Sequence, residues 1–260
     1  MEKDIFLKDY LVSRVMSMGK VVDGYSRLYY KANEDLVDQC LDVDFYHKDV
    51  LSVLASSDQV LTARYLEANT VDAFDFNRLT IYYFYLRIWS LKYRNELYPL
   101  VLRGNNKWLA TLLRLVKPST EMEQKALEFF KKHVKEGTNF INLFYEVDKQ
   151  PIGRTLYTKP EELSDCLDSE LSFHHLDLFK QFDLEKTYDI LLISNILEWA
   201  RGDKTKLQIA KDNLSRLLNK DGVVICSKLI NQSNEVINQE RDIFSDSFTY
   251  DEEHGLYIKK

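Results

Sequence analysis

The sequence predicts an α/β protein built on a doubly wound, mostly parallel sheet, and three observations lead to this. Residues 50–54 form a short apolar run that small residues break at 55–57, and apolar residues then recur at helical spacing from Asp58. A second apolar run, residues 71–74, follows at once. Residues 188–193 form the most continuous apolar segment of the chain, which is typical of a central parallel strand. Strands that alternate with helices in this way place helices on both faces of a sheet.

The first strand–helix–strand unit has the spacing of a site for a nucleotide-like ligand. In such units the turn after the first strand approaches the ligand, and an acid about 20 residues further on accepts hydrogen bonds from ribose hydroxyls. Asp75 follows Leu54 by 21 positions. The glycines that make this pattern specific are missing, and solvated strand ends are often acidic without any ligand. Ligand binding and a purely structural turn therefore both stay open on spacing alone.

Composition bounds the class of protein. With 260 residues the chain can bury the core of one large α/β domain, and its 8 glycines indicate a helix-rich fold. A net charge of −6 without a basic stripe disfavours nonspecific nucleic-acid binding. No apolar run approaches the ~18 residues of a membrane helix, and the first residues lack a signal-peptide pattern. The odd, widely spaced Cys40, Cys166 and Cys226 fit reduced thiols, so we expect a cytoplasmic protein.

The domain organisation follows from the order of these patterns. Residues 1–45 are expected to form an N-terminal helical arm, and residues 46–260 a Rossmann-like domain that carries a helical insertion at about 94–155. The arm is expected either to fold over the ligand cleft or simply to pack on the sheet. Residues 78–92 are apolar on several faces, which predicts a helix buried between the sheet and a further layer.

The predicted insertion is helical and is the natural place to determine which substrate is bound. A short apolar helix at 108–116 is stopped by Pro118, and Thr120 and Glu123 have the spacing of a capping box that opens the next helix. Another helix is expected at 139–147. The rest of the chain predicts a helix at 160–168, a third strand at 171–177, a helix at 204–218, a turn at Asp221-Gly222, a fifth strand at 223–226 and an antiparallel hairpin over 244–258.

Polar side chains end three of the predicted strands, and parallel strands bring these ends to one edge of the sheet. They are Asp75, Asp177 and the pair Ser194-Asn195. In nucleoside-binding α/β domains the second-strand acid holds ribose, the third-strand acid faces the adenine amino group, and the fourth-strand tip faces the reacting atom. A second role for Asn195 is to cap the helix that follows it.

Several segments resemble a family of class I methyltransferase-fold proteins whose function is largely unknown. Its characterised relatives include the bacterial enzyme that transfers the 3-amino-3-carboxypropyl group of S-adenosylmethionine (SAM) to diacylglycerol in betaine-lipid synthesis. The resemblance extends over about residues 25–230 and is carried by Asn33-Glu34-Asp35, by residues 50–61, by residues 71–77 with Tyr82-Tyr83, and by residues 188–196.

The resemblance implies SAM as cofactor and assigns expected roles to particular residues. Asp75, with Phe76 and Asn77, would hold the ribose, and Asp177 would face adenine. The turn would line the methionine part of SAM with Ala55, Ser56, Ser57, Asp58 and Gln59. Ser194 and Asn195 would border the sulfonium, and Glu34 or Asn33, from the arm, would face the cleft. Glu34 and Asn195 are thus the candidate catalytic residues.

Two departures from the family pattern bear on function. The family usually has glycine where this chain has Leu54 and Ser57, and a leucine there would crowd the cofactor. Ser194-Asn195 are followed by Ile196-Leu197 and not by the Pro-Pro-aromatic motif of amino-directed methyltransferases. Two functions follow: a SAM-dependent transferase that moves a methyl or 3-amino-3-carboxypropyl group to a small or lipid-like acceptor, or a catalytically silent binding or regulatory module. The five histidines have no metal-ligand spacing, so no metal is expected.

Overall fold

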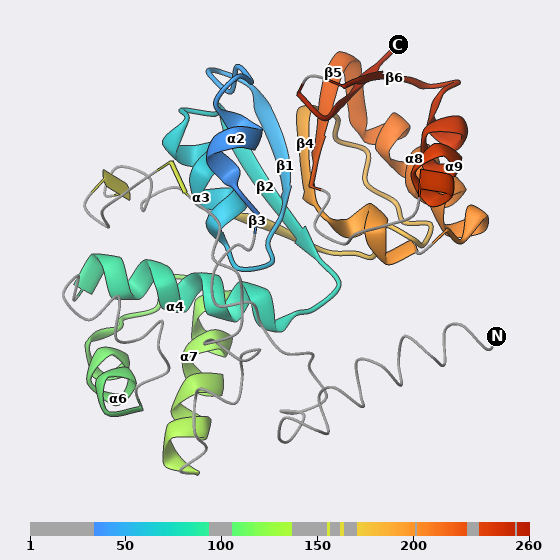
Figure 1. Ribbon diagram of the computed structural model, residues 1–260. Helices are drawn as coiled ribbons and strands as arrows, with labels where there is room; N and C mark the ends of the chain where they lie inside the picture. The colour runs from blue at the N-terminus through green and yellow to red at the C-terminus, as the bar shows by residue number, and fades with distance from the viewer. Residues whose placement is uncertain are drawn as a thin grey trace.

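The computed structural model describes residues 34–93, 106–136, 155–156, 162–163, 171–200, 202–227, 234–252 and 254–260. These residues include a seven-stranded sheet in the order β3-β2-β1-β4-β5-β7-β6 (Figure 1). Its strands are β1 (Asp49–Val53), β2 (Thr70–Asp75), β3 (Ser172–His175), β4 (Tyr188–Ser194), β5 (Leu218–Cys226), β6 (Phe248–Asp251) and β7 (Leu256–Lys259).

The strand order confirms the predicted fold class. Strands β1 to β5 pair in parallel, whereas β7 is antiparallel to both β5 and β6. A dinucleotide-binding Rossmann sheet has the order 3-2-1-4-5-6. An antiparallel β7 between β5 and β6 instead gives the sheet of the class I methyltransferase fold. The chain order reverses between β1 and β4, so their carboxyl ends form the switch point at which such sheets bind ligands.

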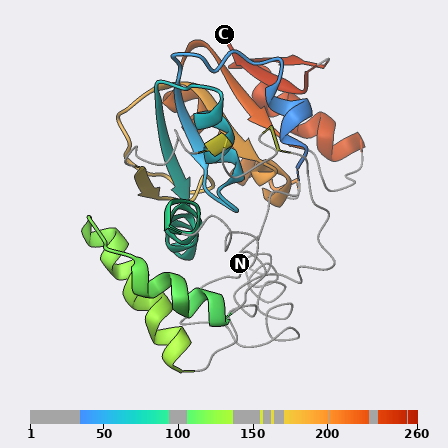
Figure 2. The same cartoon turned by 90° about the vertical axis from the view of Figure 1, so that its left-hand side faces the viewer.

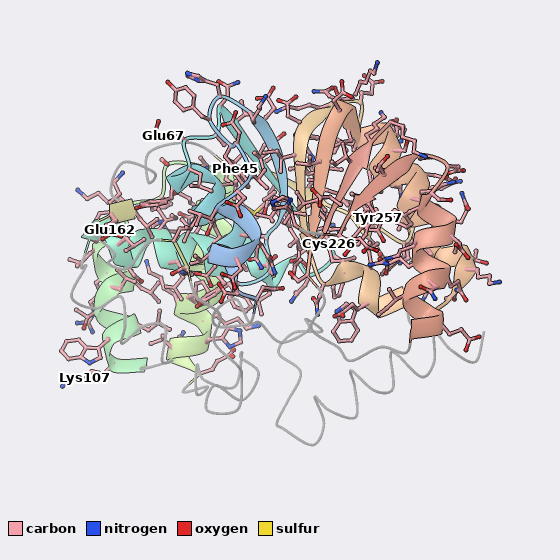
Figure 3. All side chains as sticks on the ribbon, turned by 45° about the horizontal axis from the view of Figure 1, so that its top comes forward. Phe45, Glu67, Lys107, Glu162, Cys226 and Tyr257 are labelled. Atoms are coloured by element: carbon pink, nitrogen blue, oxygen red, sulfur yellow. The ribbon has the colours of Figure 1, made fainter. Side chains whose placement is uncertain are left out.

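Helices cover both faces of the sheet. Because neighbouring side chains of a strand point to opposite faces, Val50 and Leu51 enter different apolar cores. Val50 packs with α3 (Asp58–Tyr65) and α4 (Leu79–Tyr93), while Leu51 packs with α8 (Lys204–Leu217) and α9 (Asn234–Phe244). Phe45 belongs to the first core and Tyr257 to the second (Figure 3).

The predicted further layer is present on the α4 side of the sheet. Helix α4 is buried around most of its circumference, and α6 (Asn106–Leu115) and α7 (Glu121–Lys135) pack against it on the side away from the sheet (Figure 2). The capping box of α7 is also present. Thr120 Oγ1 accepts a 3.1 Å hydrogen bond from the Glu123 N–H, and Glu123 Oε2 accepts one of 3.3 Å from the Thr120 N–H.

Several element boundaries differ from the prediction. Strand β3 ends at His175, so Asp177 lies two residues beyond it. Strand β5 starts at Leu218, before the predicted turn, and takes up Asp221-Gly222 as an irregularity between the pairs Tyr188–Leu218 and Ile190–Val223. The predicted hairpin starts at β6, because residue 244 ends α9. The helices predicted within 1–33, at 139–147 and over most of 160–168 lie outside the described residues.

The described part of the N-terminal segment contains one short helix, α2 (Leu36–Cys40). The Asp35 carboxylate caps it by accepting a 3.3 Å hydrogen bond from the Asp38 N–H. On the other side of β1, β4 leads into the short 3-10 helix η5 (Ile196–Ala200). Within the described ranges, no helix combines the length and the apolar character needed to cross a membrane.

Candidate functional site

The turn between β1 and α3 has an unusual backbone for residues that are not glycine. Ala55 has φ 40° and Ser57 has φ 76°, both in the left-handed region. An L-residue in this region is disfavoured by roughly 1–2 kcal/mol, and such strain clusters at binding and catalytic sites. Ser57 stands where the resembled family has glycine, and its backbone is the one that a glycine would favour. Side-chain contacts from other elements hold the turn in place.

The first of these contacts comes from Asp75 at the end of β2. Its carboxylate accepts a 2.9 Å hydrogen bond from the Ala55 N–H and one of 2.8 Å from the Asn77 N–H. The side chain is buried, and burial raises the pKa of Asp75 to about 6 although these N–H donors favour the charged form. Asp75 therefore joins the turn after β1 to the end of β2. Asn77 continues the chain of contacts, since its Oδ1 accepts a 3.1 Å hydrogen bond from the Leu79 N–H at the start of α4.

The second contact comes from Arg87 in α4. Its guanidinium forms a 2.8 Å ion pair with Asp58, and both side chains are fully buried. Arg87 also donates to the Ser56 carbonyl, and the Ser56 hydroxyl donates a 2.9 Å hydrogen bond to Asp58. From the sequence, Asp58 was expected to line the ligand and Arg87 was not a candidate. An arginine within an otherwise apolar helix was the available indication, because a buried charge requires a partner.

A third set of contacts lies directly at the switch point. The buried Glu34 carboxylate accepts hydrogen bonds from the Gln59 amide, at 3.1 Å, and from the Ser194 hydroxyl. Gln59 belongs to the first turn of α3, and Ser194 ends β4 with a left-handed φ of 56°. Three segments that are far apart in the sequence thus meet between the carboxyl ends of β1 and β4. All three residues were candidates from sequence.

The short segment from Glu34 to Cys40 crosses this edge of the sheet. At its far end Gln39 accepts a 3.1 Å hydrogen bond from the hydroxyl of Ser227, which directly follows β5. The described part of the predicted arm therefore lies at the carboxyl edge of the sheet. Residues 25–33, including Asn33, lie outside the described residues.

The remaining candidates, Asp177, Phe76 and Asn195, lie just beyond the carboxyl ends of β3, β2 and β4. Asp177 accepts a 3.0 Å hydrogen bond from the Phe179 N–H and pairs with Lys180 at 3.4 Å, so its described contacts are local. Phe76 is 58% exposed, and its carbonyl accepts a 2.8 Å hydrogen bond from His175 Nε2. The carbonyl of Asn195 accepts a 3.1 Å hydrogen bond from Glu198, so the described bond that opens η5 uses its backbone.

Leu54 does not occupy the position expected of it. Its side chain is fully buried and belongs to the apolar core between the sheet, α3 and α4. The leucine therefore packs away from the ligand edge instead of crowding it. The prediction of a steric conflict at this residue is wrong, because the side chain of a strand-end residue points to one face of the sheet and here that face is the core.

Two buried polar atoms at the turn have no hydrogen-bond partner within the described structure. They are the hydroxyl oxygen of Ser57 and the amide oxygen Oε1 of Gln59. Buried polar groups are nearly always paired, so such atoms in a turn at a switch point are consistent with partners supplied by a ligand. The amide nitrogen of the same Gln59 side chain donates to the Glu34 carboxylate, so oxygen acceptors gather at the start of α3.

Solved structures of similar fold include a methyltransferase. No protein-family model matches the chain, and no curated protein matches it. The fold is similar to that of the N-methyltransferase NodS from Bradyrhizobium japonicum WM9, with 9% sequence identity and a TM-score of 0.36 over 82% of this chain and 85% of that one. At this TM-score the similarity adds nothing to what the strand order establishes.

Proposed function

We propose that the protein binds SAM at the carboxyl edge of β1, β2 and β4 and transfers its methyl or 3-amino-3-carboxypropyl group to a small or lipid-like acceptor. The observation that carries this proposal is the buried Glu34 carboxylate, bonded to Gln59 and Ser194 at the switch point. The resemblance to the family of the betaine-lipid enzyme supports the same assignment.

Charge favours a cationic nucleoside over a dinucleotide. Glu34 places a buried carboxylate, bonded to Gln59 and Ser194, where the chain order reverses. SAM carries a sulfonium and an ammonium group, and a carboxylate in a poorly solvated position attracts both. A pyrophosphate would be repelled there, and the turn lacks the glycines that let a backbone approach pyrophosphate. These features support SAM as the ligand.

The proposed roles of the other candidates follow the order of the strands. Asp75, with Phe76 and Asn77, takes the ribose hydroxyls, and Asp177 takes adenine. The Asp75 carboxylate already accepts N–H groups from Ala55 and Asn77 and a hydrogen bond from the Thr80 side chain, so a ribose hydroxyl would have to share or replace one of these donors. The methionine part lies along residues 55–59, and Ser194 and Asn195 border the sulfonium.

The proposed transfer does not require a dedicated general acid or base from the protein. SAM supplies an activated electrophile, so what this chain contributes is orientation and exclusion of water. Glu34 holds the positive charge, and Asn195, at the tip of β4, orients the reacting groups. The acceptor enters from the side of α4. There α6 and α7 form a layer in addition to the sheet and its flanking helices, and this layer selects the acceptor.

Calorimetry with SAM and with its uncharged-sulfur product, S-adenosylhomocysteine (SAH), tests the proposal. We expect one site per chain, and we expect Glu34→Gln to weaken SAM more than SAH, because only SAM carries the sulfonium. An equal loss for both ligands would place Glu34 at the amino-acid end instead. Glu240→Gln is the matched control, since Glu240 is also buried but bonds to Tyr257 away from the ligand edge.

One outcome would favour the second candidate, a catalytically silent module. It is the absence of binding by either ligand at millimolar concentration in a protein that is otherwise folded. Ser57 in place of the family's glycine and the missing Pro-Pro-aromatic motif are the observations behind this candidate.

A further inference from the structure

The buried Arg87–Asp58 ion pair connects α4 with the start of α3. Helix α3 begins at the proposed ligand turn, whereas α4 carries α6 and α7 on its outer side. The Arg87 guanidinium forms an ion pair with Asp58 at one nitrogen and a hydrogen bond to the Ser56 carbonyl at another. It lies over the ring of Tyr83, 5.9 Å from the centroid. A planar guanidinium with two fixed acceptors and a stacked ring has little freedom to move.

These bonds fix the backbone on both sides of the strained residue. The carbonyl of Ser56 belongs to the peptide that enters Ser57, and the N–H of the same peptide donates to the Leu54 carbonyl. Both polar groups of this peptide are therefore held while Ser57 stays in the left-handed conformation. These bonds hold the turn in its left-handed shape, and a side chain from α4 is one of the groups that impose it.

Stability alone is a weak reason for such a pair. Taking two charges out of water costs several kcal/mol, and a well-packed apolar pair of similar volume is often at least as stable. The arrangement instead gives one defined geometry, because the guanidinium reaches two acceptors, on Ser56 and Asp58, on either side of Ser57.

We propose that Arg87 is a positioning residue of the ligand site, which holds the turn 55–58 in its binding shape before the ligand arrives. The ligand named in this inference rests on the proposed function, whereas the preformed turn does not. Helix α4 thereby contributes to the binding site indirectly, through the bonds of Arg87 to the turn. Ligand affinity then depends on a side chain that touches no ligand atom.

Lys211 offers a matched control for the loss of a buried charge. It is 7% exposed in α8, on the opposite face of the sheet, and pairs with Asp246 at 2.9 Å. Each substitution removes a buried cation; Asp58 is left buried, whereas Asp246 is 67% exposed and stays solvated, so Lys211→Met is the milder change. Only Arg87, however, is bonded to the turn.

The first measurement is the affinity for SAH by calorimetry, at a temperature where every variant is folded. We expect Arg87→Met to raise Kd about tenfold or more, since binding must then order the turn. Arg87→Lys keeps the charge but cannot bond to both acceptors in the same geometry. Its Kd for SAH is expected to lie between those of wild type and Arg87→Met. Lys211→Met should leave Kd unchanged. An unchanged Kd in Arg87→Met would overturn the inference.

The second measurement is hydrogen exchange without ligand, which separates this inference from the proposed function. In Arg87→Met, amides 55–61 should lose more protection than those of β5, whereas Lys211→Met should show no such local loss. Exchange that rises equally in both regions would mean that Arg87 only stabilises the fold. If Arg87→Met does not fold, Arg87→Lys carries both measurements. A wild-type protein that binds neither SAM nor SAH defeats the proposed function, while exchange still decides the role of Arg87.

Discussion

The carboxylate of Asp75 accepts a 2.9 Å hydrogen bond from the backbone N–H of Ala55, across the gap between the ends of β2 and β1. The acid expected to hold ribose therefore also holds the turn expected to hold the rest of the ligand. Loss of affinity in an Asp75 variant would follow from either role. The pH dependence of stability reports on the Asp75 carboxyl more directly than ligand affinity does, because burial gives this carboxyl a pKa of about 6.

Asp75 should make stability fall as the pH rises. The folded state binds the Asp75 proton more tightly than the unfolded state, whose aspartate pKa is about 3.9. The free energy of unfolding should thus decrease through the window from about pH 4 to pH 6, by on the order of 2–3 kcal/mol from this group. Urea unfolding of wild type and Asp75→Asn between pH 4 and 8 isolates the contribution as their difference. Parallel curves would show that the carboxyl titrates normally.

Ser57→Gly should stabilise the protein. Glycine adopts a φ of 76° without the penalty of a side chain, and the substitution removes a buried hydroxyl without a described partner. After the greater entropy of glycine in the unfolded chain, we expect a gain of about 1 kcal/mol. Ser56→Gly is the control in the same turn, because it loses the hydroxyl that bonds to Asp58 and should destabilise. A loss of stability in Ser57→Gly would mean that the hydroxyl has a structural partner.

Leu54→Ala should lower stability without improving ligand binding. The side chain is fully buried in the α3 and α4 core, so its removal is expected to cost about 2–5 kcal/mol of unfolding free energy. Chemical denaturation measures this cost, and calorimetry with SAH measures the affinity of the folded variant. Tighter binding in Leu54→Ala would restore the steric conflict that the core position of the side chain argues against.

Tyr188→Phe should destabilise the protein at neutral pH and less so in acid. The Tyr188 hydroxyl donates a 2.7 Å hydrogen bond to Asp72. Burial of Asp72 opposes its ionisation, yet hydrogen bonds from His174, Tyr188 and Lys186 lower its pKa to about 2. The ionised Asp72 therefore stabilises the folded state above about pH 4, and this contribution is lost as the pH falls toward 2.

The expected cost of Tyr188→Phe at pH 7 is about 1.5–3 kcal/mol, the range for a hydrogen bond to a charged group. Urea unfolding between pH 3 and 7 should show the gap between wild type and variant narrowing toward the acid end. Tyr46→Phe serves as the control, since Tyr46 is 56% exposed, and should change little. A gap that stays constant across this range would separate the hydroxyl from the titration of Asp72.

Local pattern was enough to predict the elements that surround the site. The apolar run at 188–193 became β4, which ends at Ser194, and the capping pair Thr120 and Glu123 marks the start of α7. The second predicted strand also ends at Asp75, as expected, whereas the bond of Asp75 to the Ala55 N–H was not predicted. These features depend on residues close in sequence or on the fixed geometry of a strand–helix–strand unit, so periodicity and spacing encode them.

Features that depend on distant partners were not predicted. The burial of Arg87 is explained by Asp58, 29 positions earlier in the chain, and no spacing rule connects a mid-helix arginine with a turn. The left-handed conformations of Ala55, Ser57 and Ser194 were equally hidden, because glycine is the residue that marks them in a sequence. The end of β3 before Asp177 is set by where pairing with β2 stops, which the apolar pattern did not contain.

The position of β7 also has a consequence for the order in which the chain can fold. Strand β6 is made before β7 but joins the sheet through it, since β7 lies between β5 and β6. The sheet therefore cannot grow outward strand by strand as the chain emerges during synthesis. The hairpin forms within microseconds by local contacts, but its docking on β5 must await the whole of residues 248–259. Until then β5 presents an open edge with unpaired backbone groups, which makes this edge the place where a nascent or partly unfolded chain is most exposed to mispairing.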